Sequence, residues 1–148
     1  MTTRDVFLKS LANTTLAARN WFWASTAERT REEYFAKGKL GDAGKGAVYV
    51  YLNAHHEPLY VGEAGRPIKR RMHDLTSPHK KATWWNEWTT VRLLAVHDRT
   101  DRLTLELLLI LGCKPQFNRK PGACEVEAMF QNLTLVGADV PQAARRST

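Results

Sequence analysis

Two short apolar segments separated by a polar turn constrain the fold of this chain more than any other feature. The segment Ala47–Leu52 consists of small, β-branched and aromatic residues, and the segment Leu59–Val61 has the same character. Residues of these types favour β-strands. The residues between the two segments, 53–58, include Asn53 and Pro58, which are typical of turns. The sequence therefore predicts a β-hairpin in the middle of the chain.

The residues after the hairpin predict a helix, a third strand and a second helix. A helix over about Pro67–Leu75 would begin with a proline, whose missing N–H costs nothing in the first turn. Residues Thr89–His97 alternate between apolar and polar well enough for a strand. The apolar run that follows predicts a helix over about 101–111, which Gly112 can end.

The two ends of the chain differ from this central region. Residues 3 to about 36 are predicted to be helical, because apolar residues such as Leu11 and Phe22 recur at near-helical intervals. Residues 38–46 contain four glycines, a composition typical of a linker. The sequence therefore predicts three parts: a helical extension with its linker (1–45), a folded domain (46–122) and a partly mobile tail (123–148).

The charge of the chain indicates the kind of partner it binds. Its 148 residues include 22 Lys and Arg against 15 Asp and Glu, a formal net charge of +7. Such a surplus favours an anionic partner, most often nucleic acid, although a well-solvated surface gives the same composition. The two cysteines do not have a zinc-binding spacing, which indicates a reduced, intracellular protein. No apolar run is long enough to cross a bilayer and no signal-peptide pattern is seen, so the expectation is a cytoplasmic protein without membrane contact.

Glu106 is the strongest single indication of chemistry. It lies in the apolar run Leu103–Leu111, where a carboxylate is costly to bury unless it is paired or binds a metal. The alternative, a glutamate on the solvated stripe of a helix, is disfavoured because the residues at 103, 107 and 110 are all aliphatic. A carboxylate in this position is a natural ligand for a hard divalent cation such as Mg²⁺, with water completing the coordination shell.

A basic segment follows the hairpin. Ile68 and Met72 are four residues apart and would face the core of a helix, which leaves Lys69, Arg70 and Arg71 around the rest of it. On spacing alone, a solvated basic helix face explains this segment. A guanidinium is nevertheless well suited to a phosphate, because its planar fork of donors matches the phosphate oxygens.

Five residues in a fixed order resemble the signature of the GIY-YIG nuclease domain: Tyr49, Tyr60, Arg71, Glu106 and Asn118. Ala-Val-Tyr at 47–49 corresponds to the first motif, Tyr-Val-Gly at 60–62 to the second, and Asn118 closes a Pro-x-aromatic-Asn sequence. The resemblance covers about residues 46–120. It implies an α+β fold in which a small three-stranded antiparallel sheet is flanked by helices, here with an N-terminal helical extension.

The resemblance also implies a metal-dependent endonuclease that hydrolyses phosphodiester bonds in DNA. Glu106 would hold Mg²⁺ or Mn²⁺, and Arg71 would stabilise charge on the phosphate, with Arg70 as the alternative in a register shifted by one residue. Tyr49 and Tyr60 would direct their hydroxyls into the cleft and orient water and phosphate. Asn118 would hold the site together through a hydrogen bond.

One departure from the GIY-YIG signature favours an alternative function. Many members of the family carry a histidine four residues after the arginine, and here that position is Leu75. The identity of the general base therefore stays open. The alternative function is a nucleic-acid-binding module in which the GIY-YIG scaffold is retained and the site is idle.

Basic and aromatic residues near the predicted site suggest how DNA would be bound. Lys69, Arg70, Lys80 and Lys81 would contact the phosphate backbone, which makes the affinity sensitive to salt. The neighbouring tryptophans 84, 85 and 88 could either stack on bases or fill the core. The core is favoured for Trp88, and both alternatives stay open for the other two.

The N-terminal extension is predicted to pack on the domain or on a second copy of it, and packing on the domain is favoured. Trp21, Phe22 and Trp23 form more apolar surface than a free-standing segment should expose. Basic residues of the same extension, Arg19, Arg29 and Arg31, would then widen the DNA-binding face. Specificity would be loose, read by the loops of the domain, or supplied by a homodimer or a targeting partner.

Overall fold

A single antiparallel sheet lies at the centre of the protein. The computed structural model describes residues 1–35, 46–65 and 82–118. Its four strands are β1 (Arg29–Thr30), β2 (Ala47–Leu52), β3 (Pro58–Ala64) and β4 (Thr90–Ala95), arranged in the order β1-β4-β2-β3 with every neighbouring pair antiparallel. The expected α+β fold is confirmed, and the three predicted strands are present. The two-residue strand β1 is an addition at the edge of the sheet.

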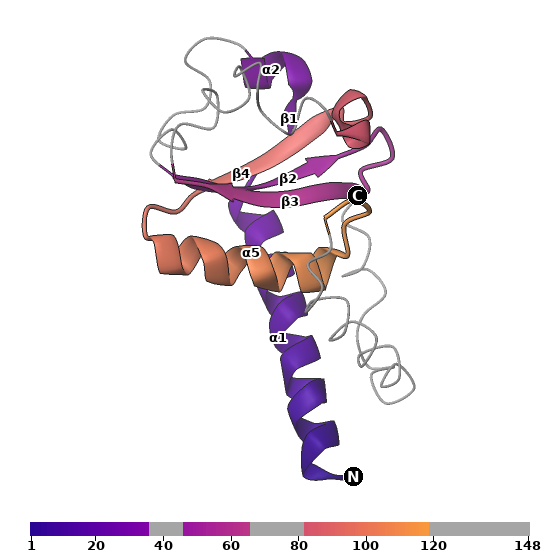
Figure 1. Cartoon of the computed structure of the whole chain (residues 1–148), viewed down its shortest axis with the longest axis vertical. Helices are drawn as coiled ribbons and strands as arrows, with labels where there is room; N and C mark the ends of the chain where they lie inside the picture. The colour runs from indigo at the N-terminus through magenta and orange to yellow at the C-terminus, as the bar shows by residue number, and fades with distance from the viewer. Residues whose placement is uncertain (36–45, 66–81, 119–148) are drawn as a thin grey trace.

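Helices cover both faces of this sheet (Figure 1). The long helix α1 (Thr3–Ser25) and helix α5 (Arg99–Cys113) lie on one side, and they cross each other. The short helix α2 (Arg31–Phe35) and the 3-10 turn η2 (Thr83–Asn86) lie on the other side. No helix within the described ranges has both the length and the apolar character needed to cross a membrane.

Each face of the sheet has its own hydrophobic core, because side chains alternate along a strand. The α1/α5 face contains the aliphatic residues of β2, together with Val61, Phe22 and the buried side of α5. The opposite face is aromatic. It contains the following residues: Tyr34, Tyr49, Tyr51, Tyr60, Trp84, Trp85 and Trp88. We call these two groups the aliphatic core and the aromatic core.

The predicted hairpin is present with a defined register. Tyr49 pairs with Gly62 and Tyr51 with Tyr60, and the register shifts between Tyr51 and Leu52. The turn is closed by Asn53, whose side-chain oxygen accepts hydrogen bonds from the backbone N–H groups of His55 and Glu57 at 2.9 and 3.0 Å. Asparagine is common in turns because its side chain can satisfy the backbone in this way.

The prediction of a continuous helix from residue 3 to about 36 is wrong after Ser25. Helix α1 ends there, and the extended backbone of Thr26 leads into β1, where Arg29 pairs with Val91. Within the polar residues 26–33, which would have formed an exposed helix face, Arg29 and Thr30 instead join the sheet as β1, and the chain becomes helical again at Arg31. The cause is a tertiary contact, because hydrogen bonds to β4 stabilise the extended conformation and outweigh the local helix propensity.

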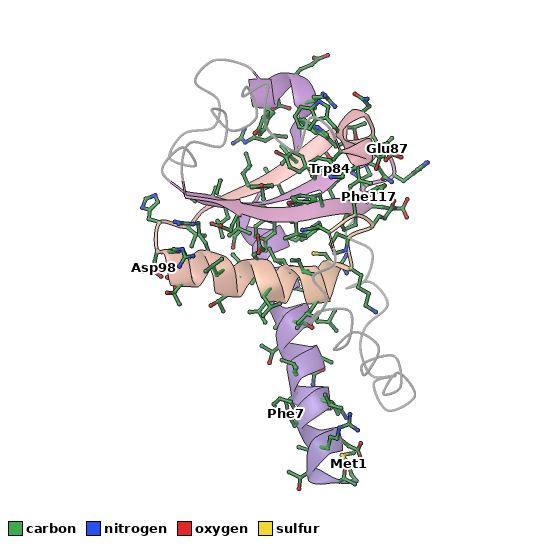
Figure 2. All side chains as sticks on the ribbon, viewed as in Figure 1. Met1, Phe7, Trp84, Glu87, Asp98 and Phe117 are labelled. Carbon is green, nitrogen blue, oxygen red and sulfur yellow. The ribbon has the colours of Figure 1, made fainter. Side chains whose placement is uncertain are left out.

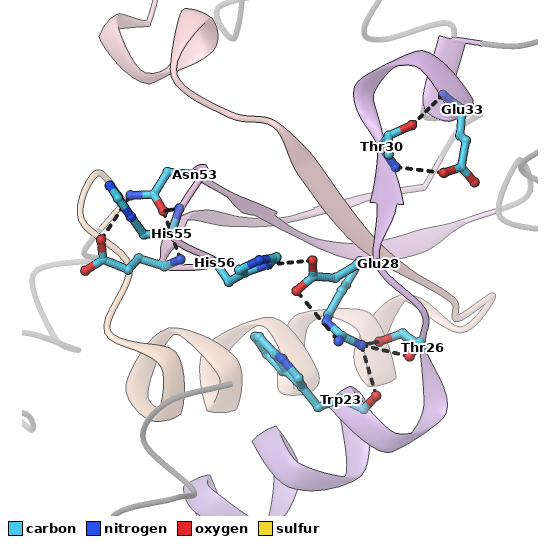
Figure 3. A network of polar contacts seen from close by, with 10 residues as sticks. Trp23, Thr26, Glu28, Thr30, Glu33, Asn53, His55 and His56 are labelled. Atoms are coloured by element: carbon cyan, nitrogen blue, oxygen red, sulfur yellow. Dashed lines mark hydrogen bonds and ion pairs between the residues drawn. The ribbon is translucent and has the colours of Figure 1, made fainter. Parts of the chain in front are cut away.

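A polar network holds this extended segment in place (Figure 3). The guanidinium of Arg92 donates hydrogen bonds to the backbone oxygens of Trp23 and Thr26 at 3.1 and 2.8 Å. Arg92 also lies 3.8 Å from the carboxylate of Glu28, which is in turn 2.7 Å from the His56 ring. These contacts tie the end of α1 to β4 and to the hairpin turn.

Helix α5 agrees closely with the prediction from sequence. Its N-cap is Asp98, whose side chain accepts a hydrogen bond from the N–H of Asp101 at 2.9 Å. The helix continues one residue past Gly112 and ends at Cys113, and its C-cap is Lys114, which has a left-handed backbone with φ of 51°. Gly112 has another role, because a Cβ there would lie 2.6 Å from the backbone oxygen of Thr15. Its missing side chain lets α1 and α5 approach closely.

Candidate active site

Tyr49 and Tyr60, the two motif tyrosines, lie side by side on the aromatic face. Their ring centroids are 6.4 Å apart with an interplanar angle of 21°. Tyr60 is half-buried on the edge strand β3, whereas Tyr49 is fully buried on β2. The Tyr49 hydroxyl is buried, and the end of the ring lies against its cross-strand partner, Gly62.

Gly62 is required by this packing. A Cβ at position 62 would lie 2.5 Å from the Tyr49 hydroxyl oxygen and 2.6 Å from the adjacent ring carbon. No real Cβ contact is that short, so any side chain there would displace the ring. The glycine of the second motif thus makes room for the tyrosine of the first.

Gly62→Ala is expected to destabilise the protein by about 1–3 kcal/mol, because overpacking a buried ring forces neighbours to shift. Urea unfolding of the wild type and the variant would measure this. In a Tyr49→Leu background the same glycine substitution should cost clearly less, since the ring it collides with is gone. Equal costs in both backgrounds would contradict the proposed contact.

Asn118 makes the hydrogen bonds expected of a positioning residue. Its side-chain oxygen accepts from the N–H of Val61 at 2.8 Å, and its side-chain NH₂ donates to the C=O of the same residue. The two residues before it add backbone bonds from Gln116 to Pro58 and from Phe117 to Leu59. A carboxamide has the same donor and acceptor groups as a backbone amide. Asn118 therefore completes the free edge of β3, next to Tyr60.

Glu106 is buried on α5, as the sequence predicted. Only 8% of the residue is exposed, and it lies on the same side of the helix as Arg102, Leu109 and Ile110, which are four, three and four residues away. These neighbours are also buried, whereas Leu107 is 42% exposed. The solvated stripe of α5 thus passes through Leu107, and Glu106 faces the sheet.

Arg102 is an important residue that the sequence analysis missed. Its Nε donates to the Glu63 carboxylate at 2.9 Å, and its Nη1 donates to the backbone oxygens of Val96 and His97 at 3.2 and 2.6 Å. This buried guanidinium joins the start of α5 to the ends of β3 and β4, and thereby sets the position of Glu106 one turn later. The detectable signal was the spacing of four residues between Arg102 and Glu106.

The donor set fits a hard divalent cation held by a single carboxylate. Glu63 on β3 forms an ion pair with Arg102, and Glu106 is the buried carboxylate of α5. Within the ranges that the structure describes, no group of three His, Cys, Asp or Glu side chains is close enough to form a metal site. Mg²⁺ is commonly bound through one or two carboxylates and several waters, so Glu106 alone meets the minimum requirement.

Cys113 does not add a metal ligand or a nucleophile to this site. Burial raises the pKa of the Cys113 thiol to about 12, and the nearby Arg19 opposes this shift. The thiol is therefore protonated at neutral pH, and a thiol binds metals and attacks electrophiles only as the thiolate.

The structure brings some of the predicted residues together and separates others. Tyr49 and Tyr60 belong to the aromatic core, whereas Glu106 lies on the helix that covers the opposite face. The two tyrosines and Glu106 are therefore on opposite faces of the sheet, and Asn118 binds at the free edge of β3. The predicted phosphate-binding residues, namely Lys69, Arg70, Arg71, Lys80 and Lys81, lie outside the described residues, as does Leu75.

The tryptophans after this segment are core residues in the described structure. Trp84, Trp85 and Trp88 are 3%, 9% and 1% exposed, which settles the open alternatives in favour of packing. Figure 2 places Trp84 over the sheet on the side away from α5. A stacking platform for bases would require exposed rings.

Two arginines of the extension make structural contacts, and the prediction that Arg19 widens a DNA-binding face is wrong because its side chain is buried. Arg19 is 3% exposed, and its guanidinium lies 5.3 Å from the centre of the Trp23 ring. Arg31 donates to the backbone oxygens of Trp85 and Trp88. Arg29 is more exposed and lies 3.9 Å from Glu33.

Comparisons with known proteins agree with this architecture. The sequence model of the UvrC-like GIY-YIG domain matches residues 45–119, just over half of the chain. Two relatives, the UvrABC system protein C of Bacteroides fragilis strains ATCC 25285 and YCH46, are each 31% identical over 98 residues. The alignment covers 63% of this chain and only 16% of each relative. No solved structure matches the chain. The match spans both tyrosine motifs, Glu106 and Asn118, and the chain therefore belongs to the UvrC-like GIY-YIG domain family.

Proposed function

We propose that the protein is a metal-dependent endonuclease that hydrolyses phosphodiester bonds in DNA. A nuclease-type function is supported by the family. The observation that most favours catalysis over binding alone is the buried carboxylate of Glu106, which is 8% exposed on the side of α5 that faces the sheet. A carboxylate in such a position is a natural ligand for a hard divalent cation.

In this proposal each residue of the site has its own role. Glu106 would hold Mg²⁺ or Mn²⁺, and the ion supplies Lewis-acid stabilisation of charge on the phosphate oxygens. Arg71 would add a planar pair of donors to the same phosphate. Tyr60, the half-buried tyrosine, would orient water and phosphate. The Tyr49 ring stacks on the Tyr60 ring, and Asn118 holds the edge of β3 in place by hydrogen bonds.

A binding module with an idle site is the second candidate. The leucine at position 75, where many family members have histidine, favours it. Both candidates predict that DNA is bound through Lys69, Arg70, Lys80 and Lys81, with an affinity that falls as salt rises. Only the endonuclease predicts cleavage that requires a divalent cation.

Incubation of supercoiled plasmid with the protein separates the two candidates. With Mg²⁺ we expect nicked or linear DNA, and with EDTA we expect none. Retention of the plasmid in a gel shift without any cleavage, in Mg²⁺ and in Mn²⁺, would favour the binding module. Linear, branched and single-stranded substrates in the same assay would show which DNA is cleaved.

The same assay decides which arginine acts on the phosphate. Arg71→Ala is expected to lower the turnover rate more than Arg70→Ala does, by about tenfold or more. Arg71→Lys should recover little, because an ammonium is a point charge without the planar fork. A larger loss at Arg70 would place the catalytic arginine one residue earlier.

A further inference from the structure

A stack of three aromatic rings runs across the face of the sheet and ends on Trp84. The Trp84 and Tyr60 rings are 4.7 Å apart between centroids with an interplanar angle of 18°. Tyr60 in turn stacks on Tyr49 at 6.4 Å. Tyr60 is thus covered on one face by the indole and bordered on the other by a second tyrosine. These contacts join η2, β3 and β2.

The N-terminal extension holds the turn from which Trp84 projects. The Nη1 of Arg31 donates to the backbone oxygen of Trp85 at 2.8 Å and to that of Trp88 at 3.3 Å. The guanidinium also lies 5.0 and 4.5 Å from the centres of those two rings. The backbone N–H of Arg31 donates to Thr89, which fixes the same segment to the strand that follows. One side chain therefore binds η2 and the residues that follow it.

We propose that Trp84 and Arg31 are positioning residues for Tyr60, so that the N-terminal extension is part of the active site. The proposal rests on the proposed function and deepens it. Arg31 holds η2 at a defined height above the sheet, and η2 presents the Trp84 indole to the Tyr60 ring. Neither residue is part of the GIY-YIG signature described above.

The physical reason is the place of Tyr60 in the sheet. It lies on β3, an edge strand, and is only half-buried, so neighbouring strands restrict its ring on one side only. A stacked indole removes alternative side-chain rotamers, because any rotation of the tyrosine would break the contact between the two rings. A hydroxyl that orients a reacting group must be held within a fraction of an ångström, and small misplacements reduce the rate strongly.

Trp84→Leu tests this proposal, with Trp84→Phe as the conservative variant. We expect Trp84→Leu to lower kcat by roughly tenfold to a hundredfold, because the Tyr60 ring is no longer held. The KM for plasmid DNA should stay within about twofold, since the indole is buried. Trp84→Phe should recover most of kcat, because a phenyl ring can still stack. Arg31→Lys should lower kcat in the same direction, since lysine has no planar fork to bridge two carbonyls.

Phe22→Leu is the matched control for lost packing. Phe22 is a fully buried aromatic residue of the aliphatic core, on the opposite side of the sheet. All variants are compared at a temperature where circular dichroism shows each to be folded. A purely structural role for Trp84 predicts equal activity losses for Trp84→Leu and Phe22→Leu, and that result would overturn the proposal.

Nuclear magnetic resonance of ¹³C-labelled tyrosine gives a readout that does not need activity. The chain has 4 tyrosines, so the Tyr60 signals can be assigned by their loss in Tyr60→Phe. We expect Trp84→Leu to move these signals out of their ring-current-shifted positions. Unmoved signals would overturn the positioning role even if cleavage fell. A wild-type protein that cleaves no DNA would instead refute the proposed function, while the Tyr60 signals would still decide whether Trp84 holds the ring.

Discussion

Glu106→Gln is expected to reduce DNA cleavage by about a thousandfold or more, because it removes the anionic ligand of the metal. The substitution preserves the volume of the side chain, so the fold and the affinity for DNA should be retained. The melting temperature should stay the same or rise, since removing a charge from a buried functional site often stabilises a protein. The measurements are plasmid cleavage in Mg²⁺, a gel shift in EDTA and thermal unfolding.

Glu87→Gln provides the matched control. It makes the same chemical change at an exposed position on the turn after η2 (Figure 2), and it should cleave DNA at the wild-type rate. Wild-type cleavage by Glu106→Gln would refute the metal-binding role of this carboxylate. A Glu106→Gln protein that fails to fold would show that the carboxylate is structural.

Phe22→Ala is expected to lower the free energy of unfolding by about 3–5 kcal/mol, because it leaves a cavity in the aliphatic core. Phe22 is completely buried between α1 and the sheet, whereas its neighbour Trp21 is 55% exposed. Trp21→Ala should therefore cost no more than about 0.5 kcal/mol. Urea unfolding of both variants measures the difference between adjacent aromatic residues.

The variants Phe22→Ala and Trp21→Ala also show whether the extension packs on its own domain or on a second copy. Phe22 and Trp23 pack on the domain as predicted, whereas Trp21 is exposed within the single chain. A large cost for Phe22→Ala that does not depend on protein concentration would agree with packing within one chain. A large effect of Trp21→Ala on sedimentation would instead place that residue in a contact between two copies.

Deleting residues 1–35 should consequently do more than remove an accessory segment. The deletion would take away β1, the Arg31 anchor and Phe22, and it would expose the aliphatic face of β2. We expect an insoluble or non-cooperatively unfolding product. Deleting residues 1–4 is the control, since all four are exposed at the far end of α1, and it should be tolerated.

The sequence by itself determined the parts of this protein that depend on local pattern. The β-branched and aromatic residues of 47–52 and the turn residues after them predicted the hairpin, and the aliphatic spacing around Glu106 predicted a buried carboxylate on a helix. These features were predictable because residue type, turn residues and the spacing of apolar residues are local properties of the sequence.

Only the tertiary structure decided where the first helix stops, what the arginines do and which groups share a face. Thr26–Thr30 has no strong strand pattern, and it is extended because β4, distant in sequence, offers hydrogen bonds and the Arg92 guanidinium. In the sequence, Arg31 resembles an ordinary exposed arginine of a helix. Its hydrogen bonds to the backbone oxygens of Trp85 and Trp88 are visible only in the structure. Such contacts join segments that are far apart in the sequence. The spacing of apolar residues and the propensity for helix or strand do not reveal them, because both depend only on residues that are close along the chain.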